Sequence, residues 1–207
     1  MAERSRRASR ISGDERQRAI LASAEHLLEQ RSLDDISIED IAGGAGISRP
    51  SFYFYYSTKD DVLLALLDRV IAEVELRVAA LPRDFATDPA AAWSRSIAVF
   101  VEVFAAHRSV STAALAARAR NAQVHDLWSR SMETWADYCT EVIQAERARG
   151  AAPAGIEARD LAIALNLMNE RVLSAAFTGE RPTIDQDSTL EVLSEIWMRS
   201  IYGRPVA

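Results

Sequence analysis

The sequence predicts an all-α protein of about nine helices, with a small N-terminal helix-turn-helix unit and a larger helical C-terminal domain. Apolar residues recur at helical spacing along nearly the whole chain, and no alternating apolar and polar run of strand length interrupts them. The composition agrees, because 49% hydrophobic and 26% charged residues are proportions typical of globular domains. No apolar run approaches the roughly 20 residues that span a bilayer.

Helix starts are marked by side chains that suit the N-cap position, where an oxygen accepts the unpaired amides of the first turn. These predicted caps are Ser12 (with Glu15 in capping-box spacing), Ser37, Ser48, Ser57 or Thr58, and Asp88. Glycine and proline predict the helix ends. The first, third and fifth helices are expected to start at residues 12, 48 and 88. The fourth is expected to start at 57 or 58 and to end before 82. The other expected helices cover 37–46, 109–120, 122–149, 157–178 and 187–202.

Charge is distributed unevenly along the chain, which has a net charge of −6. The first eighteen residues hold six arginines against three acidic residues, so the N-terminal end is basic and the rest is acidic. A basic segment suits a polyanion such as DNA, although the acidic total taken alone argues against nucleic-acid binding. The segment 1–11 lacks apolar periodicity and is expected to be disordered when no partner is bound.

The segment 37–56 has the layout of a helix-turn-helix, in which two short helices are joined by a tight turn. Gly46 is the predicted pivot, because glycine tolerates the positive φ that a sharp reversal requires. The second helix carries five aromatic residues in a row, from Phe52 to Tyr56, and they cannot all face inward. Phe52 and Tyr56 lie one turn apart and are expected to share the core face.

Tyr53 and Tyr55 then project away from the core, where their hydroxyls suit phosphate oxygens and their rings suit sugars or thymine methyl groups. Arg49 and Ser51 lie at the start of the same helix, where a recognition helix meets base edges. Helix-turn-helix layouts and exposed tyrosines also occur in helical proteins that bind no nucleic acid. These residues alone therefore leave DNA binding and a purely structural role as alternatives.

The stretch from Ile20 to Leu67 resembles the N-terminal domain of the TetR family of bacterial repressors. It has an alanine-rich first helix, an Ile-Ala-Gly-Gly-Ala-Gly-Ile-Ser turn, the run Pro-Ser-Phe-Tyr-Phe-Tyr-Tyr-Ser-Thr-Lys and a following apolar helix. The similarity continues along the chain, where 47–55, 145–153 and 164–171 resemble one branch of that family. Because members of the family usually diverge beyond the DNA-binding third, the later matches are the more specific ones.

The resemblance implies DNA-binding roles for residues of the helix-turn-helix and of the helix that follows it. They are Ser37, Ser48, Arg49, Pro50, Ser51, Tyr53, Phe54, Tyr55 and Lys59. Lys59, at the start of the fourth helix, is expected to contact a phosphate together with the positive end of the helix dipole. The basic arm from Arg4 to Arg10 is expected in the minor groove or on phosphates, with a solvated tail as the alternative.

Large aromatic residues gather in the C-terminal part, on two predicted helices whose faces can meet across a gap. They recur at helical spacing with other apolar residues: Trp93, Ile97, Phe100 and Phe104, then Trp128, Met132, Trp135 and Tyr138. Such stripes form a packed core more often than a ligand pocket. Asn166 and Asn169 lie one turn apart on an otherwise apolar helix, and buried amides need partners, of which a ligand carbonyl is one candidate.

The branch that the chain resembles has a long, narrow, mostly apolar channel, which implies a ligand site here. Its residues would be Trp93, Ile97, Phe100, Phe104, Trp128, Met132, Trp135, Tyr138, Asn166, Asn169, Glu170, Leu173 and Trp197. Three positions depart from that branch, since Ala92, Cys139 and Ser174 replace its methionine, threonine and phenylalanine. These departures predict a wider pocket and a different ligand.

Together the patterns and the resemblance predict a homodimeric, cytoplasmic regulator that binds double-stranded operator DNA and a small hydrophobic effector, with no metal, cofactor or membrane partner. The resemblance alone implies that it represses and that the effector releases it, and the sequence leaves activation as the alternative. The expected domains are a disordered basic arm over 1–11, a DNA-binding domain over 12–58, and a ligand-binding and dimerisation domain over 59–207. The last two helices are expected to form the dimer as a four-helix bundle. Candidate interface residues, which alternatively pack within one subunit, are Leu190, Leu193, Ile196 and Ile201.

An all-α enzyme that binds a small molecule and uses Glu170 with Asn166 is the main alternative. The chain offers little else for catalysis, since His26, His107 and His125 are scattered without metal-ligand spacing and no glycine-rich phosphate loop is present. The single cysteine excludes an intrachain disulfide and fits a reducing compartment. The second alternative is an architectural DNA-binding protein without a ligand, against which a ligand-induced gain in thermal stability would argue.

Overall fold

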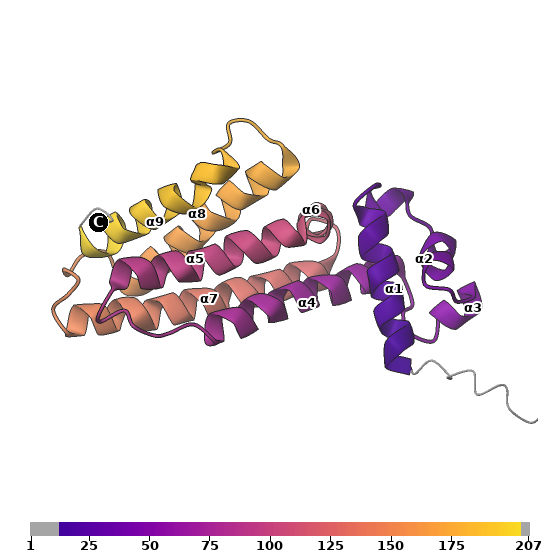
Figure 1. Ribbon diagram of the computed structural model, residues 1–207, viewed down its shortest axis with the longest axis horizontal. Coiled ribbons are helices and arrows are strands. Elements are labelled where there is room, and N and C mark those ends of the chain that lie inside the picture. Colours follow the sequence, from indigo (N-terminus) through magenta and orange to yellow (C-terminus); the bar gives the residue numbers. More distant parts are fainter. Residues whose placement is uncertain (1–12, 204–207) are drawn as a thin grey trace, which may run out of the picture. The chain divides into compact units, whose positions relative to one another are not determined.

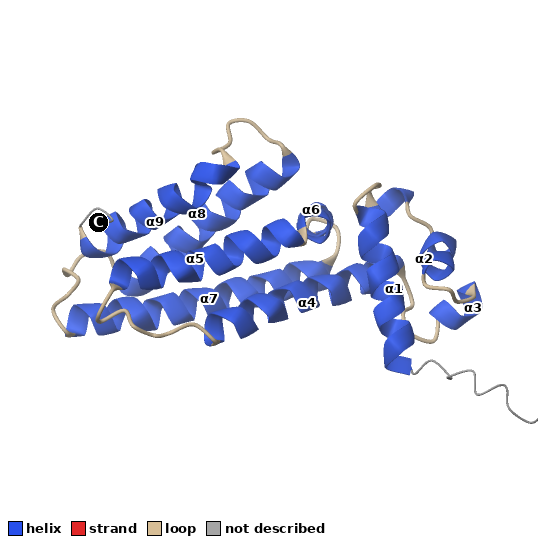
Figure 2. Ribbon diagram, in the orientation of Figure 1, coloured by secondary structure: helices blue, strands red, loops and turns tan. Residues whose placement is uncertain are grey.

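The computed structural model describes residues 13–203, and over these residues the chain is helical without a strand (Figure 2). The all-α prediction is confirmed. The elements in chain order are α1 (Gly13–Leu28), the 3-10 turn η1 (Leu33–Asp35), α2 (Ile38–Gly44), α3 (Arg49–Phe52), α4 (Lys59–Ala79), α5 (Pro89–Ala106), α6 (Arg108–Ala117), α7 (Ala122–Ala148), α8 (Ala158–Thr178) and α9 (Gln186–Tyr202). The predicted cap Ser12, the basic arm over 1–11 and residues 204–207 lie outside the described residues.

The helix starts carry the side-chain caps that local spacing predicts. Ser37 forms a capping box with Asp40: the Asp40 amide donates to Ser37 Oγ at 3.1 Å, and the Ser37 amide donates to Asp40 Oδ2 at 3.0 Å. Thr58 precedes α4, and its hydroxyl oxygen accepts the Asp61 amide at 3.1 Å. Asp88 caps α5 through its side chain. These oxygens satisfy amides that have no partner within their own helix.

The chain divides into two compact units between Leu66 and Leu67, a point inside α4. In the first unit α1 packs against α2, and α2 packs against α3 (Figure 1). Gly44 permits the close approach of α1 and α2, because a Cβ there would lie 2.2 Å from Ser23 Oγ. The core of this unit contains the fully buried side chains of Ile20, Ile36, Ile41, Phe52 and Leu63.

In the second unit α7 packs along α8, and α5 packs along α9 (Figure 1). Their shared core contains large apolar side chains from all four helices, namely Trp93, Ile97, Cys139, Ile143, Leu161, Leu165, Leu193, Trp197 and Ile201. Within the described residues no single helix is long and apolar enough to cross a membrane. Only α5 and α6 together pass that test, and they are bent by 86° at their junction.

Two of the predicted interface residues require correction. Leu193 and Ile201 are 0% and 1% exposed, and both pack in the core of their own chain. They are therefore core residues, because a side chain already covered within one subunit has no surface left for a second copy. Leu190 is partly buried against the same core, whereas Ile196 is 36% exposed on α9.

A buried carboxylate ties three helices of the second unit together. Glu146 on α7 is 3% exposed, and its Oε2 accepts the Tyr202 hydroxyl of α9 at 2.9 Å. The Trp93 indole of α5 donates to the same hydroxyl oxygen at 3.2 Å, and Arg149 Nε donates to Glu146 Oε1 at 2.7 Å. Burial, with the charge of Glu146, raises the pKa of Tyr202, so the phenol keeps its proton and remains a donor. A buried charge is tolerated here because it is paired and hydrogen-bonded.

Candidate functional site

The helix-turn-helix is closed by a turn with one left-handed residue. Gly46 has φ 68°, as the sequence predicts for the pivot, and a side chain there would be strained. The amide of Ile47 then donates to the Ala42 carbonyl at 3.0 Å, which satisfies an α2 carbonyl at the helix end. The turn leaves α3 beginning at Arg49, one residue after its cap Ser48.

Helix α3 ends at Phe52, so the predicted helix is shorter than expected and four of the five aromatic residues follow it in a turn, but the run divides between core and surface as predicted. Phe52 is 0% exposed and Tyr56 is 8% exposed, so these two side chains share the core. The phenol of Tyr56 is further held by Gln17, whose Nε2 donates to it at 3.1 Å. Tyr53 and Phe54 face outward with exposed fractions of 46% and 87%, while Tyr55 is half-buried. Phe54 is therefore an apolar side chain presented to solvent beside polar groups.

The guanidinium of Arg49 is held at the exposed start of α3. Its Nη1 donates to Glu39 Oε1 at 2.5 Å, and its Nε and Nη2 donate to the Tyr53 hydroxyl at 3.3 and 3.2 Å. The Tyr53 hydrogen bond, followed by the charge of Glu39, raises the pKa of Arg49. The side chain therefore combines a fixed positive charge with a defined direction, which suits a planar hydrogen-bonding partner.

The predicted serines of this surface serve mainly as caps. Ser37 caps α2, and the Ser48 oxygen accepts the Ser51 amide at 3.3 Å at the start of α3. The hydroxyls of Ser48 and Ser51 also share a hydrogen bond of 2.9 Å. Pro50 occupies the first turn of α3, where its missing N–H leaves no bond unmade. All but the half-buried Ser51 are exposed.

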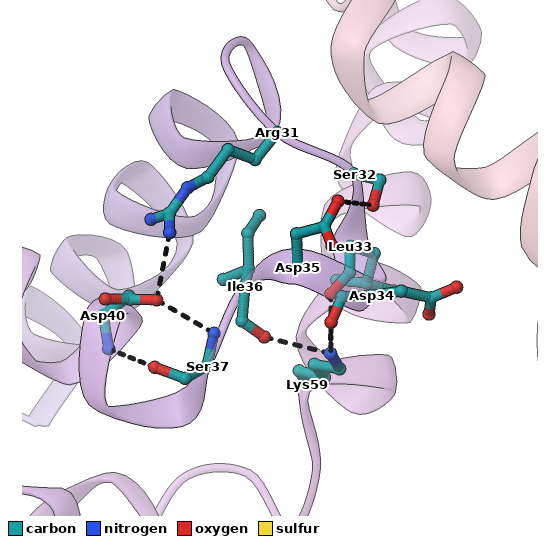
Figure 3. Close-up of polar contacts among 9 residues, drawn as sticks. All are labelled: Arg31, Ser32, Leu33, Asp34, Asp35, Ile36, Ser37, Asp40 and Lys59. Carbon is teal, nitrogen blue, oxygen red and sulfur yellow. Dashed lines mark hydrogen bonds and ion pairs between the residues drawn. The ribbon is translucent and has the colours of Figure 1, made fainter.

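Lys59, for which the resemblance implies a phosphate contact, is hydrogen-bonded within its own unit in this structure. Its Nζ donates to three backbone carbonyl oxygens, at 2.7 Å to Leu33, 3.0 Å to Asp34 and 2.9 Å to Ile36 (Figure 3). An ammonium has three N–H donors, so none remains for a phosphate in this arrangement. In this arrangement Lys59 braces the backbone of its own unit.

The second unit encloses a cavity of about 700 Å³, its open mouth included. Aromatic and apolar side chains from α5, α6, α7 and α8 form most of its wall. The predicted ligand residues that line it are Phe100, Phe104, Trp128, Met132, Trp135, Asn166, Asn169, Glu170 and Leu173. We call this space cavity A; its largely apolar lining with a few polar groups is typical of small-molecule sites.

A second space, cavity B, adjoins the first and has about 760 Å³ on the same measure. It holds the remaining predicted ligand residues, Trp93, Ile97, Tyr138 and Trp197. Four of the lining side chains are common to both cavities: Phe100, Trp135, Asn166 and Asn169. The rings of Phe100 and Trp135 meet edge to face with centroids 5.0 Å apart. The structure thus gathers every predicted ligand residue around two adjoining cavities.

Polar groups are few in these walls, and most are already bonded. Asn166 Nδ2 donates to the Ala162 carbonyl at 2.8 Å, and Asn169 Oδ1 accepts the Trp197 indole at 3.0 Å. Among the described residues nothing accepts a hydrogen bond from the buried Nε1 of Trp135. Burial raises the pKa of the Cys139 thiol to about 12, so this group is a neutral part of the wall near pH 7.

One ion pair lies in the wall of cavity A. Arg118 Nη1 is 2.8 Å from Glu170 Oε1, and the guanidinium lies over the Trp128 ring at 5.3 Å from its centroid. The pair neutralises the charge that either side chain would otherwise bring to an apolar site. It also occupies the carboxylate that an enzyme mechanism with Glu170 and Asn166 requires as acid or base.

Sequence reasoning missed the contribution of α6 to cavity A. Ser111, Leu115 and Arg118 line it from that helix and its end, and Phe177 and Thr178 line it from the end of α8. A signal was present, because 111, 115 and 118 recur at spacings of four and three, the period of one helix face. Small and polar residues at those positions concealed it.

Both units match known family models. Residues 20–66 match that of the bacterial regulatory proteins of the tetR family, and residues 93–203 match that of the C-terminal domain of the transcriptional regulator EthR. The chain is 51% identical over 201 residues to the HTH-type transcriptional regulator EthR of Mycobacterium tuberculosis H37Rv, across 97% of this chain and 93% of the relative. It is 42% identical over 200 residues to EthR of Mycolicibacterium smegmatis, across 97% and 92%.

Solved structures show the same fold at low identity. A transcriptional regulator from Saccharomonospora viridis in complex with choline has a TM-score of 0.77 and 22% identity, over 92% of this chain and 100% of that one. NalD, the secondary repressor of the MexAB-OprM multidrug efflux pump in Pseudomonas aeruginosa, has a TM-score of 0.70 and 19% identity, over 92% and 98%. Identity of about half over nearly the full length of EthR goes beyond a shared fold: the chain belongs to the TetR family and is an EthR-type DNA-binding transcriptional regulator.

Proposed function

We propose that this regulator is a cytoplasmic repressor that leaves its operator when a small, mostly apolar molecule fills cavities A and B. The observation that carries the proposal is the pair of adjoining cavities with largely apolar walls. The charges of Arg118 and Glu170 neutralise each other in cavity A, while Glu75 and Arg83 line cavity B. The lining of cavity A favours a neutral ligand group, because a charged one would be desolvated there without a free partner. The unpartnered Trp135 N–H favours a ligand with one hydrogen-bond acceptor.

Release requires that the ligand favour one arrangement of a dimer over another. Two recognition helices enter successive major grooves only when they lie about 34–36 Å apart. Helix α4 begins at Lys59 in the first unit and contributes Leu67 of the second unit to the wall of cavity A, so one helix belongs to both functions. A ligand that binds the non-operator arrangement more tightly lowers operator affinity by that difference.

Ligand binding is expected to be visible in tryptophan fluorescence, since all four tryptophans of the chain line cavity A or B. We expect alkyl phenyl ketones of increasing chain length, which are neutral and carry one acceptor, to shift or quench this emission with saturation. The same ketones should raise the unfolding temperature and weaken operator binding in a mobility-shift titration. Choline, which the Saccharomonospora viridis regulator binds, serves as a cationic probe and is expected to have the smaller effect.

Fluorescence, unfolding temperature and operator affinity together distinguish an error in the release mechanism from an error in the type of ligand. Saturable fluorescence change without loss of operator affinity would refute the release mechanism and leave the ligand site standing. No change with any ketone, together with a saturable response to choline, would refute the neutral-ligand proposal. As a matched control, Ala114→Leu adds bulk to the wall of cavity A, where Ala114 is 3% exposed, and should weaken the ketone response.

For the DNA side we propose that the exposed residues at the start of α3 and in the turn that follows it contact the operator. Arg49, Tyr53 and Phe54 are the exposed members of that surface with side chains long enough to reach bases or the backbone. The other proposed DNA contacts have side chains that are shorter or partly buried: Ser37, Ser48, Pro50, Ser51 and Tyr55. Arg49 is directed by Glu39 and Tyr53, so its position is set before DNA arrives.

Replacing Arg49 with alanine is expected to relax base preference at one operator position and to weaken binding about tenfold, the scale of one lost base contact. The measurement is a competition between the selected duplex and its single-base variants. The matched control, Glu39→Gln, removes the partner that directs Arg49 but keeps the guanidinium. Equal discrimination by wild type and the alanine variant at every position would show that Arg49 does not read a base.

A further inference from the structure

Three backbone carbonyls of the first unit converge on one side chain, that of Lys59 (Figure 3). The carbonyls belong to Leu33 and Asp34 in η1 and to Ile36, which leads into α2. Lys59 itself is the first residue of α4 and lies 23 to 26 positions further along the chain. The contact therefore joins the start of α4 to the connection between α1 and α2.

The braced segment leads directly into the helix-turn-helix. Ile36 is followed by Ser37, whose capping box with Asp40 defines the start of α2. The side chains of Leu33 and Ile36 are 6% and 2% exposed, so the core holds one side of the segment. Its own backbone provides only single-turn bonds, such as Ile36 to Leu33 at 3.3 Å. The ammonium of Lys59 bonds to all three carbonyls, those of Leu33, Asp34 and Ile36.

We propose that Lys59 is a positioning residue for operator binding: it orients α2, and through α2 the recognition helix α3, by bracing 33–36. Helices α2 and α3 pack directly against each other, so a displacement of the α2 start moves the exposed groups of α3. A phosphate that recruited this ammonium would have to displace at least one carbonyl and leave that oxygen without its donor. Lys59 thus supports DNA binding by positioning α2 and α3, without contacting the DNA itself.

The chemistry of the site favours lysine over other residues. A compact ammonium directs three N–H groups to acceptors around one point, whereas the planar guanidinium of arginine presents its donors in a fixed fork. Methionine has a similar length and no donor. Glutamine has two amide N–H groups, so it can keep part of the brace without the charge. These differences separate the loss of the brace from the loss of the charge.

The test compares Lys59→Met, Lys59→Arg and wild type on a duplex that wild-type protein selects from random DNA. Operator affinity is measured over a series of salt concentrations, because each lost phosphate contact lowers the slope of log K against log salt by about 0.9. Arg69→Met removes one exposed positive charge further along α4 and serves as the charge control. Amide hydrogen exchange over 33–40 reports the brace itself, and circular dichroism confirms that each variant is folded.

Lys59→Met is expected to weaken binding about tenfold or more with the slope unchanged. Exchange over 33–40 should become faster, and Lys59→Arg should restore only part of the affinity. A slope that falls by about 0.9 in Lys59→Met and returns in Lys59→Arg would establish a phosphate contact and overturn the proposal. Unchanged affinity in a folded Lys59→Met variant would also overturn it. If Lys59→Met is unfolded, Lys59→Gln decides by the same slope and affinity criteria.

Discussion

Replacing Phe52 with alanine is expected to unfold the first unit and abolish operator binding while the second unit stays folded. Phe52 is 0% exposed, and its ring meets those of Tyr53 and Tyr56 at centroid distances of 5.8 and 6.1 Å. Deleting a buried phenyl ring costs about 3–5 kcal/mol. A unit of this size has a total stability of roughly 3–8 kcal/mol at ordinary values per residue. The loss is therefore comparable to the whole stability of the unit.

The two units can be monitored separately in that experiment. All four tryptophans lie in the second unit, so their emission follows that unit alone, while circular dichroism follows both. We expect Phe52→Ala to lose helical signal at a lower temperature than wild type, with the tryptophan transition unmoved. Tyr53→Phe is the matched control, because it removes only an exposed hydroxyl and should keep the wild-type unfolding profile. Wild-type operator affinity in Phe52→Ala would contradict this description of the core.

Features that depend on neighbours in sequence could be predicted well. The Ser37 cap with Asp40 and the pairing of Phe52 with Tyr56 each involve residues three or four positions apart, and helical geometry determines where such residues lie. Gly46 is predictable for a related reason, since few residues other than glycine suit a positive φ. The short turn η1 has too few residues to show a period, so it escapes this kind of prediction.

The role of Lys59 could not be predicted, because its partners are backbone carbonyls. Every residue has a carbonyl group, so no residue type marks the acceptor, and the three acceptors lie more than twenty positions away. A lysine at a helix start near a helix-turn-helix is equally consistent with a phosphate contact. Only the folded arrangement of 33–36 reveals the three hydrogen bonds of Lys59.

Apolar periodicity likewise identifies which face of a helix is apolar. It does not show whether that face packs in the core, lines a cavity or meets a second copy of the chain. The aromatic residues of α5 and α7 were predicted on facing helices, yet whether they fill or line a space depends on how their shapes fit. On α9 the same period includes Leu193, which is 0% exposed, and Ile196, which is 36% exposed. The first is covered by its own chain. The second keeps an apolar surface that the described chain does not cover.

We propose that two copies of the chain meet through α8 and α9, so that placing glutamate at both Leu167 and Ile196 is expected to convert the regulator to a monomer and to weaken operator binding at least about a hundredfold. Leu167 on α8 and Ile196 on α9 are 50% and 36% exposed, on two helices that pack against each other. In a two-fold interface each substitution occurs twice, so four carboxylates would be buried without partners. A monomer contacts one half-site and loses the contribution of the other. Light scattering measures the mass, and mobility shift measures the affinity.

Two variants show whether the effect arises at an interface. Leu76→Glu changes another exposed leucine, 73% exposed on α4, and should leave a dimer with wild-type operator affinity. Leu193→Glu places the charge at a fully buried position of α9 and should unfold the second unit, which its tryptophan emission would report. The Leu167 and Ile196 double variant should instead remain folded as a monomer, because its new charges face solvent once the subunits separate. A double variant that stays dimeric would place the interface on another surface and refute the assignment to α8 and α9.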